Sequence, residues 1–336
     1  MKRRPGRAGH ALLMAAALAS TSACSGRQSA LTPAGPIAES IHTLSLVMYG
    51  GAVVVTLLVT ALMLMPFLRR GSTGDDSWRP SRGLFLLGGG VLLPGLSLTA
   101  LLFYTSSVGH EMRAAAPNAR VTIDATGHIY WWDIAYRRPS GGEPIVSANE
   151  VRLPAGEPIE IHLRSADVIH SFWIPSLAGK TDMIPGLVNR MVIEADRPGV
   201  YRGVCAEYCG AQHALMAFDV IVMEPAAFDA WLEQEGAPAR EPQTEDMQQG
   251  RDLFMRGGCG SCHTVRGVSN GKLGPDLTRV GARRTIAAGT FPNGVGPLAG
   301  WIASAQHLKP GNRMPSFGGF DGPQLRALAS YMDSLR

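Results

Sequence analysis

The chain has 336 residues, of which 46% are hydrophobic, and its formal net charge is only +4. This length allows two or three domains, and so small a net charge implies no nucleic-acid partner. The 40 glycines and 23 prolines indicate loop-rich soluble parts beside separate apolar segments, rather than one uniform core.

Residues 1–24 are typical of an export signal. Four basic residues lie within the first seven positions, and the apolar run Ala11–Ala19 that follows is too short to span a membrane. The small residues before Cys24 suit cleavage, and Cys24 could carry a lipid anchor. The alternative is ordinary cleavage with an incidental cysteine, because Thr21 stands where lipidated exports usually carry leucine.

Two uncharged runs, Ile41–Leu68 and Gly83–Gly109, come next. Each exceeds the ~20 residues that a helix needs to cross a bilayer. The four arginines between them mark the cytoplasmic side. We therefore expect a two-helix transmembrane hairpin over residues 37–112, in the bacterial inner (plasma) membrane and as part of a larger complex. The alternative is a buried hairpin in the core of a soluble protein.

From residue 115 onward, short runs of alternating apolar and polar residues are punctuated by proline and glycine, as is typical of β-strands. Many short strands of this kind predict an antiparallel sandwich or barrel over residues 115–235. We expect the strands at residues 121–125, 129–136, 149–156, 158–164, 188–195 and 217–223.

The stretch Cys205–Met216 concentrates metal-binding side chains. It contains two thiols four positions apart, followed by the imidazole of His213 and the thioether of Met216. These donor types together suit copper better than any hard cation. A second imidazole, best supplied by His170, would complete two copper ions bridged by two thiolates. The alternatives for the thiols are a disulfide or a zinc site, and neither explains the methionine.

This stretch resembles the dinuclear copper A loop of cytochrome c oxidase subunit II, as do the flanking segments His170–Leu177, Gly179–Asp182 and Ile184–Gly186. The resemblance covers residues 37–235 and implies a cupredoxin-like Greek-key β-sandwich with the metal loop at one end. It also implies a magnesium ion shared with subunit I. The implied copper A ligands are the side chains of His170, Cys205, Cys209, His213 and Met216 and the backbone carbonyl of Glu207, whose carboxylate would reach the magnesium.

Three consecutive aromatic residues, Tyr130, Trp131 and Trp132, are candidates for electron transfer. The alternative is packing in a β-sheet core, which we expect for at least one of them. Many subunit II chains carry a tryptophan at the position of Tyr130, and that tryptophan takes electrons from soluble cytochrome c. The tyrosine here therefore indicates a different entry route for electrons.

Residues 225–235 predict a short amphipathic helix, and residues 236–244 are proline-rich and polar, which indicates a semi-stiff linker. The segment after it, residues 245–336, contains Cys-Gly-Ser-Cys-His at positions 259–263, the attachment pattern of a c-type haem. The alternative is zinc, for which a second ligand pair is missing. The covalent attachment sites would be Cys259 and Cys262, and the axial histidine would be His263.

Met314, in the proline-flanked loop Asn312–Phe317, is the expected sixth iron ligand and would raise the redox potential. His307 is a rival, whereas Met255 lies too near the attachment motif and is expected in the core. Leu273–Leu277 resembles the loop of class I cytochromes c whose proline carbonyl orients the iron-bound imidazole. We expect an all-α class I cytochrome c domain with helices at residues 247–256, 299–304 and 323–335.

The whole chain resembles a subunit II of the caa type. The resemblance implies an electron-entry subunit of a proton-translocating cytochrome c oxidase, which relays single electrons from haem c to copper A and on to the haem of subunit I. The implied partners are subunit I, subunit III and an upstream donor such as a cytochrome bc complex or cytochrome c. Oxygen chemistry is not expected on this chain, because both metal sites are filled with ligands.

The alternative function is a membrane-anchored copper A and cytochrome c protein that serves another reductase. Nitrous oxide reductase would also need a histidine-rich domain, and this chain has only nine scattered histidines. A quinol oxidase subunit would lack the copper ligands.

The two soluble parts carry opposite formal charges. Residues 115–235 contain 9 Lys and Arg against 16 Asp and Glu, whereas residues 245–336 contain 11 against 6. Tethered parts of opposite charge attract at an effective concentration on the order of millimolar. We therefore expect the cytochrome domain to dock electrostatically over the copper end. The alternative is that each charge only keeps its own domain soluble.

Overall fold

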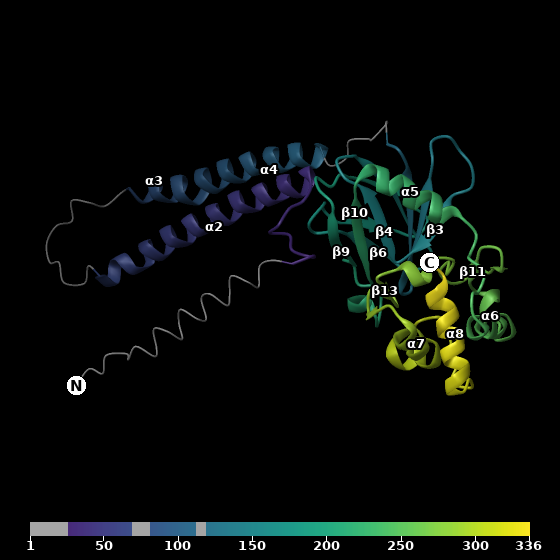
Figure 1. Ribbon diagram of the computed structural model, residues 1–336. Helices are drawn as coiled ribbons and strands as arrows, with labels where there is room; N and C mark the ends of the chain where they lie inside the picture. Colours follow the sequence, from purple (N-terminus) through teal and green to yellow (C-terminus); the bar gives the residue numbers. More distant parts are fainter. Residues whose placement is uncertain (1–25, 69–80, 112–118) are drawn as a thin grey trace, which may run out of the picture. The chain divides into compact units, whose positions relative to one another are not determined.

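The structure is a computed structural model that describes residues 26–68, 81–111 and 119–336 (Figure 1). The chain divides into two compact units, one made of Met1–Ala38 and Ala115–Arg336 and the other of Glu39–Ala114. The expected export signal and Cys24 lie outside the described residues. The division into five segments (1–24, 37–112, 115–235, 236–244 and 245–336) stays a prediction. The two compact units do not separate the β-rich part from the cytochrome part.

The unit Glu39–Ala114 is helical. It contains most of α2 (Pro36–Leu68) and a second stretch made of α3 (Arg82–Leu87), the π-helical turn η1 (Gly88–Leu92) and α4 (Leu93–Glu111). Their apolar windows have mean hydropathies of 2.4 and 1.9, and none of the residues in those windows is buried. Both are long and apolar enough to cross a membrane, and their full exposure speaks against a buried hairpin of a soluble core.

The β-rich part is a sandwich of two five-stranded sheets with the strand orders β3-β2-β1-β5-β8 and β4-β10-β9-β6-β7 (Figure 1). Most neighbours are antiparallel, but β1 and β5, and likewise β4 and β10, run parallel. The cupredoxin-like fold is confirmed, with these two parallel pairs as a difference from the purely antiparallel expectation. The strands are β1 (Thr122–His128), β2 (Trp131–Arg137), β3 (Ile145–Ala148), β4 (Glu150–Pro154), β5 (Ile159–Ser165), β6 (His170–Trp173), β7 (Thr181–Met183), β8 (Asn189–Ile193), β9 (Gly199–Cys205) and β10 (Ala217–Met223).

Aromatic side chains fill the space between the two sheets. Alternation along β2 buries Trp132, whose ring meets Phe172 edge-on at 5.5 Å and Phe218 at 5.2 Å. Phe172 and Phe218 stack at 4.5 Å between ring centroids. Gly203 leaves room for this stack, since a Cβ there would lie 2.0 Å from Phe218 Cζ. This core supports β9 and β10, the antiparallel neighbours that hold the two ends of the metal loop.

The helix α5 (Pro225–Gly236) follows β10 and confirms the amphipathic helix expected at residues 225–235. Its Phe228 and Leu232 are buried, and Trp231 meets Tyr136 at 5.0 Å. The next residues are tied to the cytochrome part, because the Ala239 amide donates to the Arg266 carbonyl at 2.9 Å.

The cytochrome part consists of α6 (Glu245–Arg256), α7 (Val295–Leu308) and α8 (Gly322–Ser334), with short turns η3 (Cys259–Ser261) and η4 (Val280–Ala282). Thr244 caps α6, and Asp321 forms a capping box with Gln324 at the start of α8. All three helices were expected, although α7 is longer and is kinked at Ser304. Sequence reasoning missed the hairpins β11–β12 (Thr264–Val265, Ser269–Asn270) and β13–β14 (Thr285–Ile286, Phe291–Pro292).

Candidate metal centres

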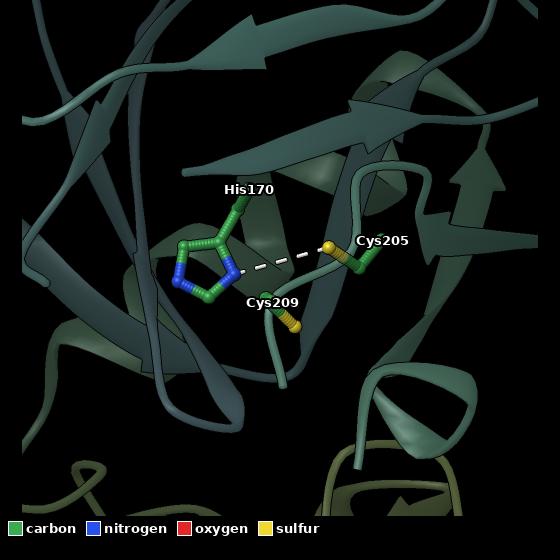
Figure 2. Close-up of side chains that lie close together, drawn as sticks. All are labelled: His170, Cys205 and Cys209. Atoms are coloured by element: carbon green, nitrogen blue, oxygen red, sulfur yellow. Dashed lines mark hydrogen bonds between the residues drawn. The ribbon is translucent and has the colours of Figure 1, made fainter. Parts of the chain in front are cut away.

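Two neighbouring strands bring the first thiol and the first imidazole together. Cys205 ends β9, His170 begins β6, and these strands pair with Phe172 opposite Cys205. His170 Nδ1 lies 3.8 Å from Cys205 Sγ (Figure 2). These two atoms and Cys209 Sγ all lie within 4.8 Å of one another. Both thiols are free, so the disulfide alternative is wrong.

The rest of the loop gives the second thiol its own partners. Cys209 Sγ lies 3.7 Å from His213 Nδ1 and 3.8 Å from Met216 Sδ. The Glu207 carbonyl lies 3.2 Å from Cys205 Sγ. Each thiol thus has its own imidazole, and one thioether and one carbonyl are added. This donor set fits copper. Tetrahedral zinc sites are formed by thiolate, imidazole and carboxylate ligands, without a thioether or a backbone carbonyl.

Hydrogen bonds inside the loop support its shape. The Cys205 amide donates to the Met216 carbonyl at 2.9 Å, and the His213 amide donates to the Gly210 carbonyl at 3.0 Å. His170 is fully buried, and Cys205 and Cys209 are 5% and 4% exposed. The loop therefore holds its two thiols and His170 away from bulk water, whereas His213 is half-buried.

Asp167 is a functional residue that sequence reasoning missed. Its Oδ1 lies 2.9 Å from His170 Nε2, and its carboxylate also accepts from the amides of Ile129 and Val168 at 2.9 and 2.8 Å. Burial alone would raise the pKa of Asp167, but these hydrogen bonds outweigh burial and lower it. The carboxylate stays charged and turns Nδ1 of His170 toward Cys205. The available signal was an acid three residues before the histidine.

The two thiols differ in acidity. The hydrogen bond from Cys209 lowers the pKa of Cys205 to about 3, against the opposing effect of burial and with further help from His170. The same hydrogen bond raises the pKa of Cys209. Cys205 is therefore ready as a thiolate, and metal binding would release the proton that Cys209 holds.

The three aromatic candidates have three different environments. Trp132 is fully buried in the core, as expected for at least one of them. Trp131 stacks on His128 with ring centroids 4.3 Å apart. Tyr130 is 8% exposed, and its hydroxyl packs against the metal loop, since a Cβ at Gly210 would lie 2.6 Å from it.

In the cytochrome part, the turn η3 carries Cys259 and leads into Cys262 and His263. His263 Nδ1 donates to the Pro275 carbonyl at 2.8 Å, the contact that the resemblance implies. Burial lowers the pKa of His263, although this hydrogen bond opposes the change. The neutral ring therefore leaves Nε2 as the free ligand atom. Gly274 makes room for it, because a Cβ there would lie 2.6 Å from His263 Cε1.

The expected sixth ligand, Met314, packs against the same apolar core as Cys259. Its amide donates to Asn312 Oδ1 at 2.7 Å, and its carbonyl accepts from Gln306 Nε2 at 2.6 Å. The rival His307 is exposed, which favours Met314. The expectation that Met255 belongs to the core is wrong, because 48% of the residue is exposed.

Two family models match the chain: "Cytochrome C oxidase subunit II, periplasmic domain" over residues 140–224 and "Cytochrome c" over residues 247–336. The cytochrome c oxidase subunit 2 of Alkalihalophilus pseudofirmus is 41% identical over 216 residues, which are 64% of this chain and 61% of that protein. The Bacillus subtilis protein of the same name is 29% identical over 73% of this chain and 70% of that protein.

Among solved structures, the periplasmic domain of subunit II of the Bradyrhizobium japonicum cytochrome oxidase is 33% identical. The match covers 36% of this chain and 96% of that chain with a TM-score of 0.33. This chain thus spans about three fifths of the length of the first relative named above and nearly all of a solved periplasmic domain.

Fold and metal loop define a cupredoxin domain of the copper A type joined to a c-type cytochrome domain. The chain carries a periplasmic domain of the cytochrome c oxidase subunit II family and a C-terminal cytochrome c domain, and this fusion fits the caa type.

Proposed function

We propose that the chain is the electron-entry subunit of a respiratory, proton-translocating cytochrome c oxidase. It relays single electrons from its covalent haem c to a dinuclear copper A centre and on to subunit I, where oxygen is reduced to water. One observation carries the proposal: two buried thiols of one loop, each with its own imidazole, lie close together in a chain that also holds a haem attachment motif.

The proposed copper ligands are the donors that converge in this loop. When bound, the copper ions and the haem iron supply one-electron oxidation and reduction. The chain itself keeps the ligands from rearranging, since the Cys205–Met216 backbone hydrogen bond and Asp167 fix the loop. The exposed carboxylate of Glu207 is free to reach a magnesium ion shared with a neighbouring subunit. The proposed copper ligands are His170, Cys205, Glu207 (through its carbonyl), Cys209, His213 and Met216.

In the cytochrome part, Cys259 and Cys262 would form the thioether bonds to the haem, and His263 and Met314 would ligate its iron. The Pro275 carbonyl holds the imidazole in the tautomer that ligation needs. A methionine as the sixth ligand would give the higher potential that suits an electron donor to copper.

Membrane attachment and partners follow from the same proposal. The two apolar helices would anchor the chain in the inner membrane, with the copper and cytochrome parts on the periplasmic side. Subunits I and III are the proposed partners, and a cytochrome bc complex or cytochrome c is the proposed upstream donor. Exposed apolar side chains beside the copper ligands fit a contact with another subunit, since Tyr208 is 74% and Ile169 45% exposed.

The test is the electron paramagnetic resonance and visible spectrum of the purified complex, for the native chain and for Cys205→Ser and Cys209→Ser. We expect a mixed-valence copper signal in the native complex and its loss in both variants, because only thiolates can bridge two coppers here. The haem absorption is the internal control and should persist. A two-copper hyperfine pattern in either variant would exclude the proposed bridge.

A further inference from the structure

Lys309 is a buried lysine for which the proposed relay has no role. It follows the last turn of α7, and only 1% of it is exposed. Its Nζ donates to the carbonyls of Tyr130, Leu215 and Ala287 at 3.2, 2.9 and 2.9 Å. Nζ thus has three carbonyl acceptors, which is as many as the donors of an ammonium group. Two of the three acceptors belong to the copper domain and one to the cytochrome domain, so that Lys309 joins the two.

The residues next to Lys309 make further contacts with the copper end. The Pro310 carbonyl accepts from Gln212 Nε2, in the metal loop, at 2.9 Å. Arg313 lies 3.4 Å from Asp167, the carboxylate that holds His170. The next residue is Met314, the expected sixth haem ligand.

A second segment of the cytochrome domain, which Lys309 reaches through the Ala287 carbonyl, adds to this contact. The Ala217 amide, at the end of the metal loop, donates to the Ala288 carbonyl at 3.0 Å. Thr290 Oγ1 donates to the Leu215 carbonyl at 3.3 Å, and Arg202 donates to the Gly289 carbonyl at 3.4 Å. The contacts of these two segments with the metal loop and β9 are therefore mainly directed hydrogen bonds to backbone carbonyls.

We propose that the segment Lys309–Met314 is the positioning element that seats the cytochrome domain on the copper loop, with Lys309 as its anchor. The inference rests on the proposed function and deepens it. The segment that would ligate the haem iron also contacts the loop that would bind copper, so it sets the separation of the two redox centres.

Lys309 and Arg313 differ in how strongly they hold the domain. Arg313 is 65% exposed in its ion pair with Asp167, and an exposed pair contributes little because water and salt screen it. Lys309 is buried and therefore shielded from water and salt ions. Its removal would take the lysine donor away from the carbonyl of the buried residue Tyr130, which is costly. We therefore expect the anchor at Lys309 to dominate.

The first test is hydrogen–deuterium exchange of the full-length chain in its oxidase complex. The Ala217 amide is the reporter, because its acceptor lies in the cytochrome domain. We expect about tenfold faster exchange of this amide in Lys309→Met and a smaller increase in Lys309→Gln, which keeps two donors. Lys272→Met is the matched control, since Lys272 is an exposed lysine of the same domain. The Val220 amide, inside β10, should not change in any variant.

The second test is the rate of haem-to-copper electron transfer after flash photolysis in the same samples. We expect this rate to fall in Lys309→Met, with the haem and copper spectra unchanged. If Lys309→Met does not fold, the exchange of the Ala217 amide and the electron-transfer rate are both measured in Lys309→Gln. Unchanged Ala217 exchange would overturn the anchor, and faster exchange with an unchanged transfer rate would overturn the positioning role. A native complex without a copper A signal would instead overturn the proposed function and leave the exchange result standing.

Discussion

At the scale of single residues, Asp167 shows how a side chain that binds no metal can control one that does. Its carboxylate accepts from His170 Nε2 and from two backbone amides, so the imidazole has one orientation. Partners of this kind typically change metal affinity about 10- to 100-fold when they are lost.

We therefore expect Asp167→Asn to weaken copper binding by at least about tenfold, because a neutral amide orients the imidazole less firmly and adds no negative charge. Competition with a chelator, followed by electron paramagnetic resonance, measures the loss. Asp182→Asn, at an exposed position of β7, is the control. Equal copper retention in the two variants would contradict the role given to Asp167.

Asp133 on β2 gives a prediction for the pH dependence of stability. Burial raises its pKa from 3.8 to about 6, nearby Asp276 adds to the increase, and Arg283 opposes it. The folded state therefore holds a proton that the unfolded state has lost between these pH values. Stability from this group is present at pH 4 and is lost as the pH rises through 6, by about 2–3 kcal/mol.

The variant Asp133→Asn should remove this loss. We expect its free energy of unfolding to exceed that of the native chain by roughly 1–3 kcal/mol at pH 8 and to approach the native value at pH 4. Thermal unfolding of the purified chain, followed by circular dichroism across this range, measures the difference. Asp252→Asn, at an exposed position of α6, should show no such trend. A constant difference at all pH values would rule out the carboxylate as the cause.

At the scale of elements, the loop Leu273–Leu277 depends on a missing side chain. A Cβ at Gly274 would lie 2.6 Å from His263 Cε1, so Gly274→Ala must displace the imidazole or the loop. We expect the haem to remain covalently attached, because Cys259 and Cys262 are untouched, but its absorption spectrum and midpoint potential to shift. Gly296→Ala is the control, since a Cβ there meets nothing within 4 Å. A native potential in Gly274→Ala would mean that the loop yields without strain.

The sequence was a good guide to elements with a strong local pattern. Alternation predicted residues 217–223 as a strand, which is β10, and the apolar face of residues 225–235 predicted α5. The short strands β3, β6 and β7 were missed, because three or four residues show no period. The two-residue hairpins of the cytochrome part carry even less signal. The kink in α7 at Ser304 depends on packing, and no sequence pattern predicted it.

The same contrast holds for the sites. The copper and haem candidates were found from residue types at fixed spacing, such as the twelve residues from Cys205 to Met216. The role of Lys309 could not be found this way, because all its acceptors are backbone carbonyls, which every residue carries. Net charge predicted that the two domains attract, but not which atoms meet.

At the scale of the whole molecule, the salt dependence of electron transfer distinguishes two causes of domain docking: attraction between net charges and directed hydrogen bonds. Raising salt from about 0.1 M to about 1 M shortens the Debye length from ~10 Å to ~3 Å, which weakens attraction between exposed charges. Simple charge-driven docking would make haem-to-copper transfer slower over this range. Because Lys309 is buried among its acceptors, we now expect the native rate to change little.

The variant Lys309→Met should respond differently, because it lacks the buried anchor and depends more on the attraction between the opposite net charges of its domains. We expect its transfer rate to fall as salt increases, with Lys272→Met behaving as the native chain. Flash photolysis at a series of salt concentrations measures both. A native rate that falls as steeply as that of Lys309→Met would restore charge attraction as the main cause of docking.

The buried position of the two thiols has a consequence for biogenesis. Cys205 and Cys209 are 5% and 4% exposed, and the neighbouring Leu215 carbonyl is held by Lys309. Copper delivered from outside has to reach both sulfurs, so we expect loading to precede the seating of the cytochrome domain. A copper-free chain in which Lys309→Met loosens that domain should then take up copper faster than the native one. Copper loading would then come before the docking of the cytochrome domain, so that the two steps of maturation follow a fixed order.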